Sequence, residues 1–536
     1  MQKYIVVTGG VLSGLGKGIV TSSIGYLLKA QGYKVSPVKI DPYINIDAGT
    51  MRPTEHGEVF VTEDGGETDQ DLGNYERFMN INLKKRNNIT TGQIYKKVIE
   101  KERNLEYNGK CVEVIPHISL EVINRLESIS KNEKSDFVLV EIGGTVGDYQ
   151  NILFLEALRE TNRRNKNVVF IHVVYLPIPD NIGEMKTKPA QHSVRALNGV
   201  GIQPDFIICR SREPIDSVRR EKLAVFCNMN NEDVIDAHDL EIVYEIPVLF
   251  EKQGLCEKIL KRFNLRYKRN RIKEWRLKID KIKKLKDEVK IGIIGKYFTS
   301  GNFSLTDSYI SVLEAIKHAS WYLNFKPVIE WIDSNNINER NLDSLNRFDG
   351  LIVPGGFGEK GIEGMILSIR YARENNIPFL GICYGMQLAV IEFARDVCNM
   401  KEANSTEIDK NTKYPVIDVL EEQKKILYEN RYGATMRLGD YPAKLKQNTV
   451  IWKLYNKKDI IYERHRHRYE VNPVYVKELE EKGLVFSGFS TDRLLMEFLE
   501  IPSHKYFVAT QSHPCFKSRF NWPSPLFLGL IKAAKA

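Results

Sequence analysis

The sequence has few cysteines and no long apolar run. Seven cysteines are scattered singly among 536 residues, with no C-x-x-C pair, and such usage is typical of a reducing, cytoplasmic setting. No apolar run reaches the ~20 residues that a membrane span needs. The amino terminus enters an expected strand at once, without a signal-peptide pattern. We therefore predict a cytoplasmic protein with no membrane partner.

The net positive charge of the chain comes from one segment. The formal net charge is +9, but residues 261–290 alone hold 14 Lys and Arg against 4 Asp and Glu, so the remainder is close to neutral. One interpretation of this basic segment is an arm that binds nucleic acid. The segment lacks interleaved glycines and aromatic platforms, so we favour a solvated, partly helical connector and expect no nucleic-acid partner. Since single cores stop growing near ~250–300 residues and a fresh apolar strand starts at Val289, we predict domains 1–265 and 289–536, joined by a basic linker, 266–288.

A glycine-rich turn follows the first expected strand. The run YIVVTGG-VLSGLGKG-IVTSSIGYLLKAQG predicts a strand, a turn carrying Lys17, and a helix that Gly32 ends. Backbone N–H groups, the helix N-terminus and Lys17 would together bind phosphate oxygens. Gly10 and Gly16 are one residue too far apart for G-x-x-x-x-G-K-[ST], and Gly18 replaces the hydroxyl residue, so Mg²⁺ needs ligands elsewhere. The alternative is an ordinary strand–helix turn.

Carboxylates occur at the ends of further expected strands. The strand Val35–Ile40 contains Lys39 and precedes Asp41, and an acidic glycine-rich turn, residues 58–71, ends in Asp71. Glu141 closes another strand ahead of two glycines. Mg²⁺ takes one or two carboxylates together with phosphate and water, whereas a solvated acidic loop is the alternative for the turn. Further strands are predicted at 112–115, 137–142, 168–175 and 206–209, and their alternation with helical spans predicts a mostly parallel α/β sheet.

The first half resembles the amidoligase domain of CTP synthase. The matching pieces are VTGGVLSGLGKG, KIDPYIN, GEVFVTEDGGETDQDLG, VEIGGTVGD, KTKPAQHS and FCN. The resemblance implies a P-loop-like synthetase domain in which Asp71 and Glu141 bind Mg²⁺ and Lys17 acts on the transferred phosphoryl group. The implied ATP contacts are Gly14, Leu15, Gly16, Lys17, Gly18, Ile19, Lys39, Asp71, His238, Asp239 and Leu240. The implied contacts of UTP, and of CTP as inhibitor, are Ser13, Asp148, Tyr149, Gln150, Lys186, Thr187, Lys188, Pro189, Ala190, Gln191 and Lys222.

A cysteine at a strand–helix junction marks the second half. In GICYGMQ, Cys383 lies between an expected strand, 378–382, and a helix, with Gly381 and Gly385 on either side. This is the nucleophile-elbow pattern with Cys in place of Ser, and the helix N-terminus is expected to lower the pKa of the thiol. A small core cysteine is the alternative. His513, after the strand 508–510, is the expected general base; His465 and His467 also suggest metal, though weakly.

This half resembles the class I glutamine amidotransferase domain. The matching pieces are PGGFG, GICYGMQ, ANSTE, TMRLG, RHRHRYEVN and the closing His-Pro. The resemblance implies a flavodoxin-like doubly wound domain in which Cys383 attacks the glutamine amide, His513 moves the proton, and the N–H groups of Gly356 and Tyr384 form the oxyanion hole. The implied glutamine contacts are Gly356, Tyr384, Gly385, Met386, Gln387, Glu407 and Arg468.

Three positions depart from the family pattern. Gln150 stands where the family has Glu, which puts CTP feedback in question. Cys515 stands where the third triad member, a Glu, is expected, so we predict weakened glutamine use with intact ammonia use, unless another acid or a carbonyl contacts His513. The loop RYGATMRLG is altered where the family implies GTP activation.

Together the two halves predict ATP-dependent amination of UTP to CTP through a 4-phosphorylated UTP, with glutamine or ammonia as nitrogen source. The resemblance also implies a homotetramer. The alternatives are a filament-forming structural relative with reduced catalysis, and another glutamine-dependent amidoligase.

Overall fold

The computed structural model describes residues 2–269, 271–296, 299–300, 303–304, 306–419 and 436–536. Contacts divide the chain into two compact units. Unit 1 consists of Met1–Asp47 and Asn74–Lys281, and unit 2 of Ala48–Gly73 and Ile282–Ala536. The acidic turn thus packs with the second half of the chain, although it lies within the first half of the sequence. The predicted boundaries at 265 and 289 remain a proposal.

Unit 1 is built on a parallel sheet of seven strands, in the order β5-β2-β6-β1-β7-β8-β9. Every neighbouring pair runs parallel, which confirms the α/β prediction. The strands are β1 (Lys3–Gly9), β2 (Val35–Asp41), β5 (Asn88–Thr90), β6 (Phe137–Ile142), β7 (Val168–Tyr175), β8 (Phe206–Arg210) and β9 (Val234–Asp236). The six residues of β6 are all buried, as expected where helices cover both faces of a parallel sheet.

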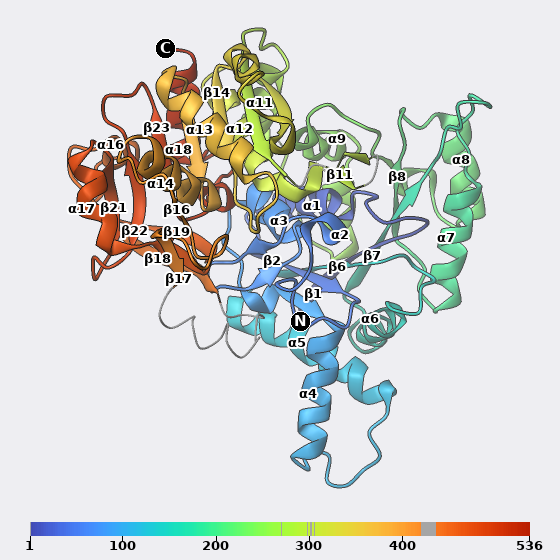
Figure 1. Cartoon of the computed structure of the whole chain (residues 1–536). Helices are drawn as coiled ribbons and strands as arrows, with labels where there is room; N and C mark the ends of the chain where they lie inside the picture. The colour runs from blue at the N-terminus through green and yellow to red at the C-terminus, as the bar shows by residue number, and fades with distance from the viewer. Residues whose placement is uncertain (1, 270, 297–298, 301–302, 305, 420–435) are drawn as a thin grey trace. The chain divides into compact units, whose positions relative to one another are not determined.

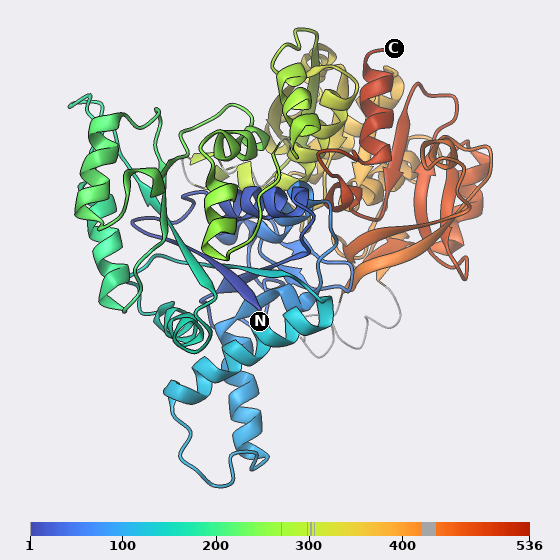
Figure 2. The ribbon, with the colours of Figure 1, turned by 180° about the vertical axis from the view of Figure 1, so that it is seen from behind.

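Helices connect these strands or follow the last of them. They are α1 (Lys17–Ala30), α4 (Thr91–Arg103), α5 (Ser119–Glu133), α6 (Ile152–Asn165), α7 (Lys188–Gly199), α8 (Ser217–Phe226), α9 (Ile246–Lys252), α10 (Leu255–Arg262) and α11 (Lys273–Ile282), while α3 (Asp71–Met79) crosses from unit 2 into unit 1. Within unit 1, α7 and α8 are in contact, with α8 above α7 in the view of Figure 1, and α4 extends away from the sheet (Figures 1 and 2).

One predicted strand is wrong. Residues 112–115 form no strand; a short helix, Val114–Ile118, begins there instead. Val114 and Ile115 are about half exposed, so no neighbouring strand covers them. Pro116 also removes a backbone donor that a sheet would need. A short apolar run therefore gave a false strand signal.

Unit 2 holds a nine-stranded sheet, ordered β13-β10-β14-β15-β23-β22-β21-β18-β19. The five strands from β13 to β23 are parallel and the last four antiparallel. Their bounds are β10 (Glu288–Gly295), β13 (Lys326–Asp333), β14 (Gly350–Val353), β15 (Phe379–Ile382), β18 (Arg437–Leu445), β19 (Ile460–His467), β21 (Val485–Ser490), β22 (Met496–Glu500) and β23 (Phe507–Thr510).

Small ladders and helices complete unit 2. The ladders pair β3 (Phe60–Val61) with β4 (Glu67–Thr68), β11 (Thr299–Ser300) with β12 (Phe303–Ser304), and join β16 (Ala403–Ser405), β17 (Tyr414–Val419) and β20 (Tyr469–Val471). The helices are α2 (Pro53–His56), α12 (Ile310–Tyr322), α13 (Ile362–Glu374), α14 (Tyr384–Asp396), α16 (Val450–Leu454), α17 (Pro473–Glu481) and α18 (Pro525–Ala534).

None of the helices in the described part of the chain could cross a membrane, since each is too short or too polar.

The basic segment is partly helical and is anchored by an aromatic side chain. Trp275, on α11, is 2% exposed. Its indole N–H donates to the Tyr244 carbonyl at 2.7 Å, and its ring lies 4.0 Å from that of Tyr26. Trp275 thus fastens the lysine-rich helix to unit 1.

Replacing this anchor should destabilise unit 1. Trp275→Ala removes a buried aromatic side chain and is expected to lower the free energy of unfolding by about 3–5 kcal/mol, measured by urea unfolding followed by circular dichroism. Leu277→Ala, at a 58% exposed position of the same helix, should change it by less than about 0.5 kcal/mol. Equal effects would show that α11 is not anchored through Trp275.

Candidate functional sites

The glycine-rich turn of unit 1 joins β1 to α1. Gly16, directly before the helix, has φ 90°, a left-handed conformation that glycine adopts without strain. Lys17 is 7% exposed, and its Nζ donates to the Gly144 carbonyl at 3.1 Å. The turn therefore presents a helix N-terminus and a lysine at one place, as phosphate binding requires.

Beside this turn, Glu141 is a buried carboxylate with its partners in place. The register of β2 and β6 sets Lys39 opposite Glu141. Lys39 Nζ donates to Glu141 Oε1 at 2.9 Å, and the Tyr75 hydroxyl to Oε2 at 2.5 Å. These bonds fix the direction of a fully buried carboxylate at the end of a strand, which suits a ligand of Mg²⁺. Asp71 lies in unit 2 as the first residue of α3, and its role as second ligand remains a proposal.

A cavity of about 190 Å³ adjoins the turn. It is lined by Gly16, Ile19, Val20, Arg210, Ala237, Asp239, Leu240, Val243 and Ile246. Asp239 and Leu240, both expected to contact ATP, thus line one cavity with Gly16 of the phosphate turn. His238 is not in this lining; its Nδ1 lies 2.6 Å from Asp236 Oδ2.

Sequence reasoning missed Arg210, which lines the cavity and pairs with Asp239 at 2.7 Å. The signal was present, because Arg210 is the last residue of β8, at the carboxyl edge where ligands of α/β sheets gather.

The residues expected to contact UTP belong to unit 1, where some are exposed and others are buried. Tyr149 is 95% exposed, and Lys222 is exposed on α8, whereas Ala190 and Gln191 are buried in α7. Lys186 pairs with Glu184 at 2.6 Å. Their assignment to a nucleotide remains a proposal.

In unit 2, Cys383 stands between β15 and α14 in a strained turn, with φ 51° and ψ −98°. Its neighbours must be small. A Cβ on Gly385 would lie 2.1 Å from the Val353 carbonyl oxygen, and one on Gly381 would lie 2.9 Å from Ala509 Cβ. The strand–turn–helix geometry of a nucleophile elbow is therefore present.

The expected nucleophile and base line one cavity, of about 80 Å³, together with Cys515 and Gly356. A second cavity of about 460 Å³ also reaches Cys383 and is lined by Gln387, Glu407 and Arg468, three of the residues expected at glutamine. Around the sulfur, Gln511 Nε2 lies 3.6 Å from Sγ, and the Arg466 carbonyl oxygen lies 3.8 Å from it. Sequence reasoning missed Gln511 and Arg466, since neither stands in a pattern that marks a reactive group.

The predicted net lowering of the pKa of Cys383 is wrong for this structure. Burial raises the pKa of the thiol to about 12, with a further contribution from the negative charge of Glu470. The hydrogen bond from the Tyr384 backbone acts in the opposite direction but is outweighed. Burial likewise lowers the pKa of His513 to about 3, helped by His467 and Arg466. At neutral pH the pair is thus a thiol and a neutral imidazole.

At the position of the expected third triad member stands a buried thiol, Cys515. It is 1% exposed, and burial and the nearby charge of Glu58 keep the pKa of its thiol well above the usual value. His513 is held by other means. Its ring stacks on Phe516 with 5.1 Å between centroids, and a hydrogen bond with the Arg466 backbone raises the pKa of the imidazole, opposing burial.

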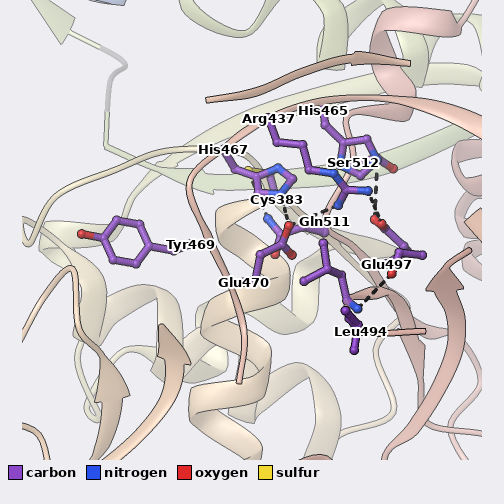
Figure 3. Close-up of polar contacts among 12 residues, drawn as sticks. Cys383, Arg437, His465, His467, Tyr469, Glu470, Leu494, Glu497, Gln511 and Ser512 are labelled. Atoms are coloured by element: carbon purple, nitrogen blue, oxygen red, sulfur yellow. Dashed lines mark hydrogen bonds and ion pairs between the residues drawn. The ribbon is translucent and has the colours of Figure 1, made fainter. Parts of the chain in front are cut away.

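Behind the thiol lies a buried ionic cluster (Figure 3). Arg437 bridges Glu470 at 3.2 Å and Glu497 at 2.6 Å, while His467 lies 2.6 Å from Glu470 and His465 lies 3.5 Å from Glu497. Burial raises the pKa of Glu497 to about 7. The two histidines thus pair with carboxylates, and among the described residues there is no group of three or more side chains suited to hold a metal.

The resting thiol should react slowly with alkylating agents. Because burial raises its pKa to about 12, Cys383 is expected to be alkylated by iodoacetamide far more slowly at pH 7.5 than the exposed Cys111, with a rate that still rises above pH 9. Peptide mass spectrometry measures both rates in one sample. Faster labelling of Cys383 than of Cys111 at pH 7.5 would contradict the neutral pair.

Comparisons with known proteins match both halves. Residues 3–265 match the family described as CTP synthase N-terminus, and residues 304–533 match glutamine amidotransferase class-I. CTP synthases of Pyrococcus abyssi and Methanocaldococcus jannaschii are 54% and 53% identical, each across 100% of this chain and 98% of the relative. A solved glutaminase domain of Trypanosoma brucei CTP synthase with bound acivicin is 35% identical, covers 46% of this chain and 94% of its own, and has a TM-score of 0.42.

These full-length similarities, together with a phosphate turn in unit 1 and a cysteine elbow in unit 2, show that the chain is an enzyme of the CTP synthase family.

Proposed function

We propose that this protein converts UTP to CTP, using ATP and a nitrogen taken from glutamine or free ammonia. The proposal rests on one observation: a chain that CTP synthases match over its whole length contains two sites. At one edge of the sheet of unit 1 are Lys17 and Glu141, and in unit 2 a cavity is lined by Cys383 and His513. The family resemblance further suggests CTP feedback, GTP activation, a homotetramer and a cytoplasmic location. Residues 431–435 of the loop tied to GTP activation lie outside the described residues.

In unit 1, the proposed step is transfer of the terminal phosphoryl group of ATP to the 4-oxygen of UTP. Lys17, at the start of α1, would offset negative charge on the phosphates. Glu141 and Asp71 would hold Mg²⁺, which supplies charge neutralisation of the phosphates when it is bound. Phosphate then leaves more readily than oxide, and ammonia takes its place on the ring.

In unit 2, the proposed step is the release of ammonia from glutamine. The Cys383 sulfur attacks the side-chain amide while His513, neutral at pH 7, takes the thiol proton and passes it to the leaving nitrogen. Water then hydrolyses the thioester to glutamate. Gln387, Glu407 and Arg468 line the adjoining cavity and are proposed to hold the rest of the substrate.

Two variants test whether phosphoryl transfer and ammonia release take place at these two separate sites. Lys17→Met should abolish CTP formation with glutamine and with ammonia, whereas Cys383→Ala should abolish only the glutamine reaction. CTP formation and UTP-dependent release of ADP are measured side by side. ATP turnover that does not depend on UTP would favour another amidoligase, and absence of turnover in the unaltered protein with ammonia would favour a structural relative.

Glutamine use should be limited by the missing triad carboxylate. The Arg466 backbone, which forms a hydrogen bond with His513, is uncharged and stabilises the protonated imidazole less than a carboxylate would. In a serine triad, loss of the carboxylate costs about 10⁴ in rate. Cys515→Glu is therefore expected to raise the glutamine-dependent rate about tenfold or more without changing the ammonia-dependent rate.

Cys515→Ser is the matched control, because it keeps the size without adding a carboxylate, and its rates should equal those of the unaltered protein. An unchanged or lower glutamine rate in Cys515→Glu would show that orientation of His513 does not limit the reaction.

A further inference from the structure

Lys296 directly follows β10 and points toward the segment that bears the expected oxyanion hole. Its Nζ donates to the Gly358 carbonyl at 2.6 Å and lies 4.9 Å from the centroid of the Tyr384 ring. Burial lowers the pKa of this amine to about 8, and the Glu407 carboxylate acts in the opposite direction. A half-buried lysine at a strand end, outside every motif discussed above, calls for a functional explanation.

Gly358 is held by two further side chains. The Tyr384 hydroxyl donates to the same carbonyl oxygen at 2.9 Å, and the Gly358 N–H donates to Glu407 Oε1 at 3.1 Å. Both backbone groups of Gly358 are therefore fixed, by side chains from three separate places in the chain: the end of β10, the first residue of α14, and the turn after β16.

The segment that these bonds hold is part of the glutamine site. Residues 355–357 line the cavity that also contains Cys383 and His513, and they lie between β14 and α13 without regular structure. The direction of the Gly356 N–H therefore depends on how the ends of the segment are held. One end is fixed by β14, and the other by the bonds to Gly358.

The charge of Lys296 also affects Glu407. Burial raises the pKa of that carboxyl, while the Gly358 N–H, Lys296 and Arg468 lower it. The carboxylate faces a cavity that also reaches Cys383. An ionised Glu407 suits the α-ammonium group of an amino acid, and the neighbouring lysine favours that ionised form.

We propose that Lys296 is a positioning residue of the glutaminase reaction: together with the Tyr384 hydroxyl, it fixes residues 355–357, the segment of the expected oxyanion hole, through Gly358. The proposal rests on the proposed function, since it assigns a role within the glutamine step. Lys296 itself need not touch the substrate.

The test compares Lys296→Met with the unaltered full-length protein. The variant should lower kcat/KM for glutamine about 10- to 100-fold, the loss expected for a hydrogen bond to a charged group, through both a lower kcat and a higher KM. Ammonia-dependent CTP formation should stay within about twofold, and so should the rate at which iodoacetamide labels Cys383. Lys290→Met, at an exposed position of the same strand, should leave all of these unchanged.

Two further variants separate positioning from mere support of the fold. Lys296→Arg keeps the charge and should recover much of the loss, particularly in KM. Tyr384→Phe removes one of the two donors to the Gly358 carbonyl, and its effect should be coupled to that of Lys296→Met in a double-mutant cycle.

An unchanged glutamine rate in Lys296→Met, or equal losses with glutamine and ammonia, would overturn the proposal. Absence of CTP formation by the unaltered protein with ammonia would instead refute the proposed function, so the two failures are distinguishable.

Discussion

Parallel strand pairing is the constraint on which both sites depend. In a parallel sheet all carboxyl ends meet at one edge, and groups far apart in sequence are brought together there. In unit 1 that edge gathers the Lys17 turn after β1, Glu141 in β6 and Arg210 at the end of β8. In unit 2 it gathers Cys383 after β15 and His513 after β23, which are neighbouring parallel strands. The chemistry of each unit is thus a consequence of its topology.

Burial then sets the protonation of the groups that the edge brings together. A helix N-terminus stabilises a thiolate, but full desolvation penalises it more strongly, and Cys383 and His513 consequently rest as a neutral pair. The Glu470 carboxylate, which Arg437 bridges to Glu497 behind the sulfur, adds to this balance, since it disfavours a second negative charge nearby.

The sequence was informative where local pattern and function coincide. The strands at 137–142 and 168–175 have the bounds that periodicity predicted, and the turns around Lys17 and Cys383 have the predicted strand–turn–helix form. The false strand at 112–115 shows the limit, because a short apolar run carries no information about whether a neighbour will cover it.

The sequence did not reveal three further residues, for a different reason: Arg466, Gln511 and Lys296. Arg466 acts near Cys383 through its backbone, and Gln511 approaches the sulfur from a strand end. Lys296 reaches Gly358 across 62 residues of sequence. Such contacts depend on tertiary structure, and residue type alone does not mark them.

The acidic turn shows how sequence order and packing diverge. Residues 48–73 belong to the stretch that matches the CTP synthase N-terminus, yet they pack with unit 2. Glu67, on β4, pairs with Arg466 at 2.9 Å, and the Val61 carbonyl accepts from Arg464 at 3.0 Å. Glu67 precedes the proposed magnesium ligand Asp71 by four residues, and Arg466 contacts the nucleophile through its carbonyl. The strand β19 therefore contacts both the segment that leads to Asp71 and the sulfur of Cys383.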